Sequence, residues 1–375
     1  MRGLFIYNKR INYNNLSGID KKVVSQVEAI NREGVECSIY ELNDTKRNRF
    51  EKLFLFLKSR FLFSNGYPSW NWDEKFGSVD FIYLRRPDSL SKDMIKVLCK
   101  AKKVNPSLRI IMEVPNYPYE SELGFRWYNR PLVYKDRYYR KKIEGIIDRI
   151  AIQNAIDELF GIKTLQFING IKMSEITVRN AYEANSDVIN ICAVASLEPW
   201  QGYERIFYGL SNYYKAGGKR KIKISIAGIG SEMDNYKSIV NQLHLGESIE
   251  FLGRLSGENL QNLYDRSDLA LDAFGRFKTG NTLSTSLKSR EYLAKGMPII
   301  TGCKTDVLRE DFGYFLEFSN DDSIIEFSRI ISFYDSIYNT GVSRNHIIKT
   351  IRRYAEETCD ISRMMSPIID YLKTM

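Results

Sequence analysis

Residues 286–300 have the composition of a helix that begins at a hydroxyl and runs into a buried strand. Hydroxyl side chains at 284–286 offer an N-cap, with Ser286 directly before the helical stretch. Gly296 stands where a helix-ending glycine belongs, and Pro298 prevents the helix from continuing. The apolar pair at 299–300 then opens a short strand. We therefore expect the free N–H groups of a helix start to be available here.

Two cations and one carboxylate lie in the first turns of this helix. Lys288 and Arg290 would add charge to a helix start that already favours anions, which suits a diphosphate. Glu291 follows Lys288 by three residues and shares its face, where a carboxylate could hold a hydroxyl-rich sugar such as ribose. The alternative for Lys288 and Arg290 is a pair of cations on a helix surface. We expect Lys288, Arg290 and Glu291 to carry the chemistry.

The segments before this helix alternate between strands and helices. Residues 223–232, 248–255 and 269–274 each combine an apolar strand with a turn, and a short helix occupies 259–265. The glycines at 228 and 230 lack the third glycine of a dinucleotide-binding fingerprint, so this motif alone is weak. The alternation predicts an α/β fold with a parallel, doubly wound sheet that binds ligands at the carboxyl ends of its strands.

Several motifs occur in the order found in a known family. They are 169–171 (Asn-Gly-Ile), 196–202 (Ser-Leu-Glu-Pro-Trp-Gln-Gly), 227–230 (Ala-Gly-Ile-Gly), 251–253 (Phe-Leu-Gly) and 291–298 (Glu-Tyr-Leu-Ala-Lys-Gly-Met-Pro). With them the chain resembles glycosyltransferase family 4, of the bacterial surface-polysaccharide type. The resemblance implies the GT-B fold: two Rossmann-like parallel-sheet domains that face each other across a cleft, with a C-terminal helix crossing back to the N-terminal domain. It also implies sugar transfer from a nucleoside diphosphate with retention at the anomeric carbon.

The chain departs from the family pattern at three positions. The family usually carries two glutamates with seven residues between them, and Glu291 matches the second, which binds ribose there. Leu283 stands at the position of the first. Ser196 and Gln201 stand where the family often has Arg and Lys, so the diphosphate charge must be met elsewhere, and Lys288, Arg290 and Arg254 are the candidates.

The resemblance also extends the expected donor site beyond these cations. Backbone N–H groups of the loop before the helix would hold the donor sugar. The expected donor-binding residues are Gly228, Gly230, Gly253, Arg254, Gly280, Asn281, Thr282, Ser286 and Leu287. No cofactor is expected besides the nucleotide-sugar substrate. The resemblance further implies a retaining hexosyltransferase. The chain has only two histidines and no Asp-x-Asp sequence, so we expect this enzyme to be metal-independent.

The expected domains are an acceptor-binding domain at 1–180, a nucleotide-sugar-binding domain at 181–350 and a returning helix at 351–375. Polar side chains at or near strand exits in the first domain are the acceptor-side candidates: Asn12, Arg85, Glu113, Tyr117 and Glu120. Two alternatives stay open. Glu113 could be a buried structural carboxylate, and Arg85 could pair with an acid at the surface.

Composition supports two globular domains in a reducing compartment. The chain has 375 residues with 43% hydrophobic content, enough for two full cores. Its five cysteines are scattered without paired spacing, which favours the cytoplasm and argues against a zinc cluster. We find no apolar run near 20 residues and no secretory segment at the start.

The net charge of +9 is confined to the first half of the chain. Residues 1–185 hold 32 Lys and Arg against 22 Asp and Glu, a net of +10, which leaves −1 for the remainder. Segments 46–63 and 126–142 interleave cations with aromatic side chains, which favours an anionic membrane surface and a lipid-linked acceptor. The alternative for both is an ordinary helix with a solvated basic side. Nucleic acid is not expected, because no recognised nucleic-acid module accompanies them.

Three functions compete at this point. The first is a cytoplasmic enzyme, peripheral on the inner face of the cell membrane, that moves a sugar to a glycan or lipid-linked oligosaccharide in capsule, exopolysaccharide or cell-wall synthesis. The second is a non-catalytic GT-B partner or glycan-binding protein, which the missing carboxylate at Leu283 motivates. The third is a GT-B enzyme of another reaction, such as a sugar-nucleotide epimerase, which the scarcity of histidine disfavours.

Overall fold

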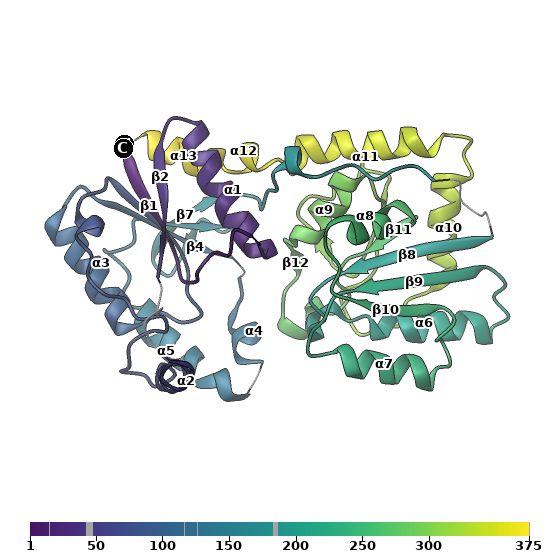
Figure 1. Cartoon of the computed structure of the whole chain (residues 1–375), viewed down its shortest axis with the longest axis horizontal. Coiled ribbons are helices and arrows are strands. Elements are labelled where there is room, and N and C mark those ends of the chain that lie inside the picture. The colour runs from purple at the N-terminus through teal and green to yellow at the C-terminus, as the bar shows by residue number, and fades with distance from the viewer. Residues whose placement is uncertain (15, 43–47, 116, 126, 183–186, 375) are drawn as a thin grey trace. The chain divides into compact units, whose positions relative to one another are not determined.

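The structure, a computed structural model, describes residues 1–14, 16–42, 48–115, 117–125, 127–182 and 187–374. The chain forms two compact units (Figure 1). Unit 1 comprises Met1–Gly170 together with Ile361–Met375, and unit 2 comprises Ile171–Asp360.

A seven-stranded sheet in the order β2-β1-β3-β4-β5-β7-β6 forms the centre of unit 1. Its strands are β1 (Arg2–Tyr7), β2 (Glu36–Glu41), β3 (Phe81–Arg85), β4 (Arg109–Val114), β5 (Arg149–Ile152), β6 (Glu158–Leu159) and β7 (Ile162–Gln166). Every pairing is parallel except β6 with β7. The apolar runs of the inner strands, such as residues 81–84, are buried on both faces, as a covered parallel sheet requires.

Helices cover both faces of this sheet. Phe5 and Tyr7 of β1 point to a core shared with α1 (Gly18–Arg32), α12 (Ile361–Met364) and α13 (Ser366–Lys373). Leu4 and Ile6 point to the opposite core, which α3 (Lys92–Val104) closes. The period of two along β1 thus serves two separate cores. The remaining helical segments of unit 1 are α2 (Arg49–Lys58), η1 (Glu74–Gly77), α4 (Glu120–Gly124), η2 (Trp127–Asn129) and α5 (Arg130–Arg140).

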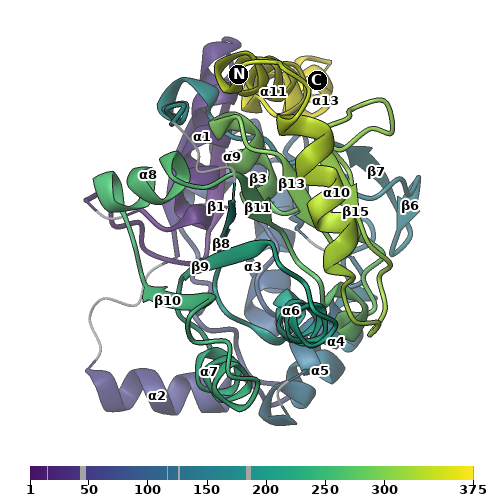
Figure 2. The ribbon, with the colours of Figure 1, turned by 90° about the vertical axis from the view of Figure 1, so that its right-hand side faces the viewer.

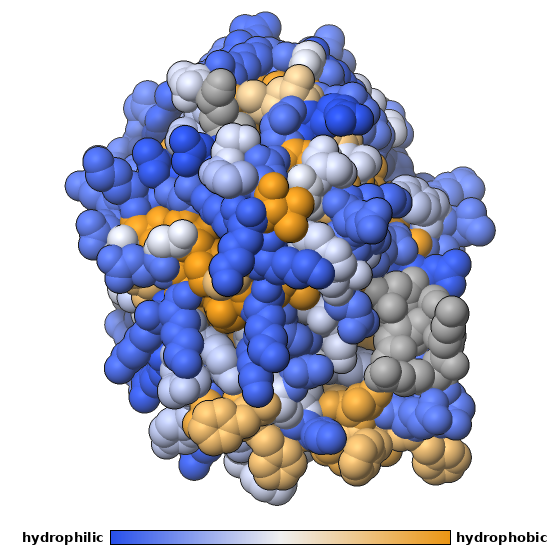
Figure 3. Space-filling view, turned by 90° about the vertical axis from the view of Figure 1, so that its left-hand side faces the viewer, coloured by the Kyte–Doolittle hydropathy of each residue, from blue (hydrophilic) through white to orange (hydrophobic). Residues whose placement is uncertain are grey.

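All ten residues of helix α2 are at least partly exposed, several large apolar side chains among them. Asn48 caps its start, accepting from the Glu51 N–H at 2.9 Å while the Glu51 side chain bonds back to the Asn48 N–H. Apolar side chains gather along the lower edge of the molecular face on which α2 lies (Figure 3). The helix is therefore formed by its cap, and its apolar side chains are left at the surface.

A six-stranded parallel sheet in the order β10-β9-β8-β11-β13-β15 forms the centre of unit 2. Its strands are β8 (Val188–Val194), β9 (Lys221–Ala227), β10 (Ile249–Gly253), β11 (Leu269–Leu271), β13 (Ile299–Thr301) and β15 (Phe315–Glu317). A parallel pair, β12 (Leu283–Ser284) with β14 (Lys304–Thr305), lies apart from it.

Helices flank the unit 2 sheet on both sides, with α8 and α9 on one side and α6 and α10 on the other (Figure 2). The helical segments are η3 (Met173–Glu175), η4 (Pro199–Gln201), α6 (Glu204–Lys215), α7 (Met233–Gln242), α8 (Gly257–Asp265), η5 (Arg276–Thr279), α9 (Leu287–Lys295), α10 (Phe327–Tyr338) and α11 (Arg344–Thr358). The strand order reverses between β8 and β11. Ligands of such sheets bind beside this reversal, at the carboxyl ends of the strands.

The prediction of an α/β chain with two Rossmann-like parallel sheets is confirmed. The unit boundaries fall at Gly170 and Asp360 instead of near 180 and 350. Ile171 belongs to unit 2 because its N–H donates to Cys359 O at 2.9 Å. Helix α11 belongs there too, since Arg352 donates to Ala294 O of α9 at 2.9 Å. The segment that returns to unit 1 is thus α12 with α13.

Candidate functional site

Helix α9 begins and ends as its sequence predicts. Ser286 is the N-cap, and its hydroxyl accepts from the Lys288 N–H at 3.2 Å. Gly296 ends the helix at φ 79°, a left-handed conformation that favours glycine. A Cβ there would also lie 2.6 Å from Ile348 of α11. Both ends are fixed, so the first turn of α9 is held at the carboxyl edge of the unit 2 sheet.

Lys288 lies at the centre of a polar network at this edge. Its Nζ lies 2.5 Å from Gln201 Oε1 and 3.3 Å from both the Tyr203 hydroxyl and Asp272 Oδ1. Asp272 is fully buried and also accepts from Ser289 Oγ at 2.5 Å. Burial lowers the pKa of Lys288 to about 8, although Asp272 opposes the shift. The network therefore holds one poorly solvated cation, already paired with a buried carboxylate, in the first turn of α9.

Gln201 links this cation to the loop after β8. Its amide Nε2 donates to Ser196 O at 3.1 Å while its Oε1 accepts from Lys288. Both departures from the family pattern, Ser196 and Gln201, therefore contact the Lys288 network. A neutral amide at 201 leaves Lys288 as the cation of this network.

Arg290 is fully buried and engaged within the protein. Its Nη2 donates to both carboxylate oxygens of Asp306, at 2.7 and 2.6 Å, and its Nη1 donates to Ser286 O at 2.8 Å. Hydrogen bonds between two charged groups are short and strong. The geometry favours Arg290 as a brace between the helix start and the segment after β14 over the direct phosphate contact expected from the sequence.

Glu291 lies on the same helix face, partly buried. The buried Tyr264 of α8 donates its hydroxyl to Glu291 Oε1 at 2.9 Å. Burial and the nearby Glu291 carboxylate raise the pKa of Tyr264 well above its ordinary value, so it stays a donor. The carboxylate is thereby oriented by a second element.

The glycines after β9 permit close approach of two loops. A Cβ on Gly228, at φ 141°, would lie 1.7 Å from Ala195 O, and one on Gly230 would lie 2.3 Å from Leu197 O. The Gly228 N–H donates to Gly253 O at 2.7 Å. Three strand exits are thus packed backbone against backbone. Arg254, directly after β10, is exposed at this edge.

The loop before α9 is a turn with one buried amide. Gly280, at φ 72°, ends η5. The Asn281 side chain donates to Thr279 Oγ1 at 2.9 Å, and its carbonyl accepts from Asn320 at 2.8 Å. Thr282 is exposed, Leu283 opens β12, and Leu287 is the first residue of α9. The structure therefore places Gly280, Asn281, Thr282, Ser286 and Leu287 along one continuous segment that leads to Lys288.

The sequence interpretation missed Asp272, Asp306 and Tyr203 as partners of the expected site residues. Asp272 follows the apolar strand at 269–271 directly, and an acid at the exit of a buried strand is a signal that could have been used. Asp306 and Tyr203 carry no comparable pattern.

In unit 1 the structure places Glu113 inside a closed ion-pair cluster. Its carboxylate accepts from Lys22 and Arg85, each at 2.7 Å, and from Gln26 and Tyr83, each at 2.9 Å. Burial alone would raise the pKa of Glu113, but Lys22 and Arg85 outweigh it and lower the pKa to about 2. Glu113 is fully buried, which favours its structural alternative, and Arg85 pairs with this buried carboxylate and not with an acid at the surface.

The other acceptor-side candidates lie in different surroundings. Asn12 is exposed and accepts from the Asn14 N–H at 3.2 Å. Tyr117 packs edge-on against Tyr119 and Phe160. Glu120 at the start of α4 pairs with Arg137 and Arg140 of α5, and the bond from Arg137 is the main cause that lowers the pKa of Glu120.

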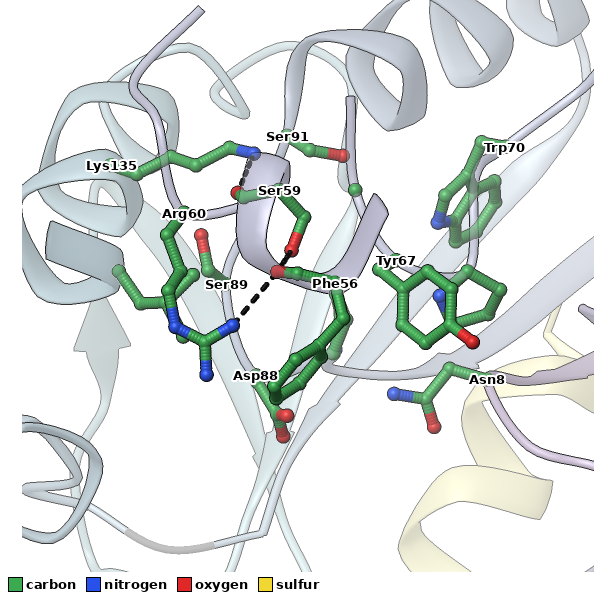
Figure 4. Close-up of a pocket in the computed structure, with 14 residues that line it drawn as sticks. Asn8, Phe56, Ser59, Arg60, Tyr67, Trp70, Asp88, Ser89, Ser91 and Lys135 are labelled. Atoms are coloured by element: carbon green, nitrogen blue, oxygen red, sulfur yellow. Dashed lines mark hydrogen bonds between the residues drawn. The ribbon is translucent and has the colours of Figure 1, made fainter. Parts of the chain in front are cut away.

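A pocket in unit 1 lies beside the last turn of α2 (Figure 4). Phe56, Tyr67, Asp88 and Lys135 are among its walls, and Asn8 after β1 closes one end. Its volume of about 30 Å³ is enough for ordered water. We therefore do not assign a sugar to this pocket.

Comparison with known proteins identifies the class of fold. Residues 174–326 match the sequence model of the family described as Glycosyl transferases group 1. A glycosyltransferase from Rickettsia africae is 14% identical, with a TM-score of 0.64 over 100% of this chain and 98% of its own. Sucrose-phosphate synthase from Thermosynechococcus elongatus is 12% identical, with a TM-score of 0.65 over 100% of both chains.

A third similar structure holds a nucleotide sugar. Anabaena HepE in complex with UDP-glucose is 12% identical, with a TM-score of 0.60 over 100% of both chains. No curated protein matches the chain in sequence. The likeness to these structures is one of fold, and the fold of this protein is GT-B.

Two kinds of feature are absent from the described residues. Within those residues no helix is long and apolar enough to cross a bilayer. Nor does the described part of the chain bring together three or more His, Cys, Asp or Glu side chains that could hold a metal ion.

Proposed function

We propose that this protein is a glycosyltransferase that takes a sugar from a nucleoside diphosphate bound by unit 2. The observation that carries the proposal is Lys288, a poorly solvated cation in the first turn of a capped helix, three residues from Glu291 on one face. A diphosphate at the helix start would be attracted by the Lys288 cation and the free N–H groups, and Glu291, oriented by Tyr264, would accept from ribose hydroxyls. The match of residues 174–326 to group 1 glycosyl transferases supports the same assignment.

The chemistry we propose is retaining and metal-independent, with a hexose as the transferred group. The leaving diphosphate would itself take the proton of the acceptor hydroxyl, while the protein positions both substrates and stabilises the departing charge. Lys288 and the N–H groups of the α9 start would supply that stabilisation. Glu113 and Glu120 are engaged by cations, so neither suits the role of a general base.

The acceptor we propose is a glycan or lipid-linked oligosaccharide in bacterial surface-glycan synthesis, used at the inner face of the cell membrane. The basic net charge of residues 1–185 supports an anionic surface as partner. Membership of glycosyltransferase family 4 is part of this proposal. It rests on the ordered motifs from Asn169 to Pro298.

A donor-binding experiment tests this assignment. Thermal shift with UDP, GDP and their sugars should raise the unfolding temperature, since a ligand at 100 times its Kd stabilises by about 2.7 kcal/mol. Glu291→Ala should weaken binding and lower activity roughly 10–100-fold, because a charged hydrogen-bond acceptor is lost. Glu258→Ala, an exposed carboxylate on the neighbouring helix, is the matched control. Unchanged affinity in Glu291→Ala would remove Glu291 from the site.

The second candidate is a non-catalytic GT-B partner, which Leu283 favours because the family's first glutamate is absent there. Both candidates predict nucleotide binding, so only turnover separates them. A panel of nucleotide sugars with glycan acceptors should yield a transferred sugar. Binding without transfer or donor hydrolysis would favour the partner role.

A further inference from the structure

Helix α2 turns its apolar face away from the protein. Phe50, Leu53, Phe54 and Leu57 have the i, i+3, i+4, i+7 spacing of a core-facing stripe, yet they are 84, 54, 64 and 52% exposed. Such a stripe normally faces the interior of a globular protein. Its outward orientation leaves a contiguous apolar surface that calls for an occupant.

Buried polar contacts hold this helix on unit 1. Lys135 of α5 donates to Ser59 O at 2.7 Å and Asn65 O at 3.0 Å, just after α2 (Figure 4). Arg60 donates to Phe56 O at 2.8 Å and to Tyr128 O at 3.2 Å. Because Arg60 is itself buried, its side chain holds the end of α2 against the segment before α5 and is not available as a surface cation. The helix is thus anchored at its last turn and presents its apolar stripe outward.

Two further groups of aromatic side chains extend the exposed surface. Phe61 and Phe63 follow α2 at 71 and 69% exposure, and the Phe63 ring lies 6.0 Å from Tyr138 of α5. Trp127 and Tyr134 are also exposed. Trp and Tyr favour the headgroup level of a bilayer, where the ring is apolar on one side and wet on the other. We call residues 48–64 and 127–142 together the α2–α5 surface.

The net charge of the α2–α5 surface indicates which kind of partner binds it. Segments 48–64 and 127–142 together hold ten Lys and Arg and two acidic residues, of which Arg60, Lys135 and Asp136 are buried. The eight remaining cations against one acid, Glu51, give the surface a net charge of +7. A second copy of the chain docked on the same face would bring +7 against +7, which is strongly unfavourable. An anionic bilayer offers both an apolar interior for the stripe and negative headgroups for the cations around it.

We propose that the α2–α5 surface docks on an anionic lipid bilayer, with the apolar stripe of α2 in the interface and Arg49, Lys52 and Lys58 at headgroup level. This docking proposal deepens the proposed function. Only one of its consequences rests on that function, namely that the acceptor is held in the same bilayer. The docking itself requires no sugar transfer.

Vesicle co-sedimentation of the full chain tests the docking. Wild type should bind vesicles that contain phosphatidylglycerol and phosphatidylcholine. It should bind vesicles of phosphatidylcholine alone at least about tenfold more weakly. Replacing Phe50, Leu53, Phe54 and Leu57 with Gln should weaken binding by a further factor of about ten or more. Ile324→Gln with Val342→Gln, which removes exposed apolar side chains from unit 2, should bind as wild type does.

A charge series gives an independent measure. Arg49, Lys52 and Lys58 changed to Gln should reduce binding up to about 100-fold at low salt, at about fivefold per cation. The same change at Lys215, Lys219 and Lys237, exposed cations of unit 2, should have no comparable effect. High salt should remove the difference between the charge variant and wild type.

Three results would overturn the proposal. The first is equal vesicle binding by the apolar variant and wild type, and the second is equal binding of wild type to neutral and anionic vesicles. The third is a dimer of the wild type in solution that the apolar variant does not form. Unfolding temperature and UDP binding should match wild type in all variants, because the changed side chains are exposed. Transfer to a lipid-linked acceptor should fall in the apolar variant while transfer to a soluble analogue persists. Vesicle binding without any transfer would leave the docking intact and refute the proposed function instead.

Discussion

Lys288 combines several polar contacts with a pKa that is lowered by burial. Its ammonium lies among Gln201, Tyr203 and Asp272, and burial brings its pKa to about 8, within reach of physiological pH. A lysine in water would remain charged to about pH 10.4. The charge state of one residue therefore couples any anion bound there to the acidity of the medium.

Donor binding should weaken as the pH rises through about 8, because the Lys288 cation is present below that value and is lost above it. Well above the pKa of Lys288 in the free protein, each further pH unit should raise the Kd of the donor by at most about tenfold. Titration calorimetry with UDP from pH 6.5 to 9.5 measures it. Lys288→Gln should bind weakly with no such pH dependence, whereas Lys304→Gln, an exposed cation, should keep the wild-type profile. A wild-type affinity that is flat to pH 9.5 would contradict this role.

The sequence was enough to predict which residues form the candidate site, but it did not reveal the side chains with which they pair. Ser286, Gly296 and the glycines at 228 and 230 have roles set by local backbone geometry, and local spacing reveals them. The engagement of Arg290 by Asp306, 16 residues away, depends on how β14 lies against the helix start. A pairing between separate elements leaves no periodic trace in the chain.

Helix α9 owes its position to two attachments at opposite ends. Arg290 and Asp306 fix its start, and the contact of Gly296 with Ile348 fixes its end against α11. The first turn is therefore rigid before any ligand arrives, which reduces the ordering cost of binding.

Asp306→Asn should destabilise unit 2 by about 3 kcal/mol, because it leaves the buried Arg290 guanidinium without its counter-charge. Denaturant unfolding measures the loss, and UDP binding should weaken as the helix start loosens. Asp311→Asn, which removes an exposed acid a few residues away, is the control and should change stability by less than about 0.5 kcal/mol. Equal stability of the two variants would show that the brace contributes little.

At the scale of the whole molecule, the alternation of strands and helices was enough to predict two parallel sheets. Each inner strand is an apolar run between turn residues, and that pattern is local. The boundaries at Gly170 and Asp360 were less accessible, because they depend on the pairing of Ile171 with Asp360, nearly 200 residues apart. The exposed stripe of α2 could not be assigned either, since its spacing is the same as that of a buried face.

Sugar transfer should survive EDTA, because we expect Lys288 and the α9 start to meet the diphosphate charge without a metal ion. Transfer rates measured with chelator and after adding Mg²⁺ or Mn²⁺ should agree within about twofold, well under the loss expected from removing a Lewis acid. Activity abolished by chelator and restored by either cation would assign part of the diphosphate contact to a metal.

Unit 1 is assembled from two stretches of chain that lie on either side of unit 2 in the sequence. Ile361, Met365 and Ile368 fill the core that Phe5, Val27 and Ala29 also line. During translation, this core of unit 1 therefore stays incomplete, with α1 present but α12 and α13 still missing, until the ribosome has made all of unit 2. Unit 2 has no such dependence, since its residues are contiguous. Unit 1 should thus complete this core only after unit 2 has been synthesised, and the late-completed core is where a stalled chain would be most open to chaperones.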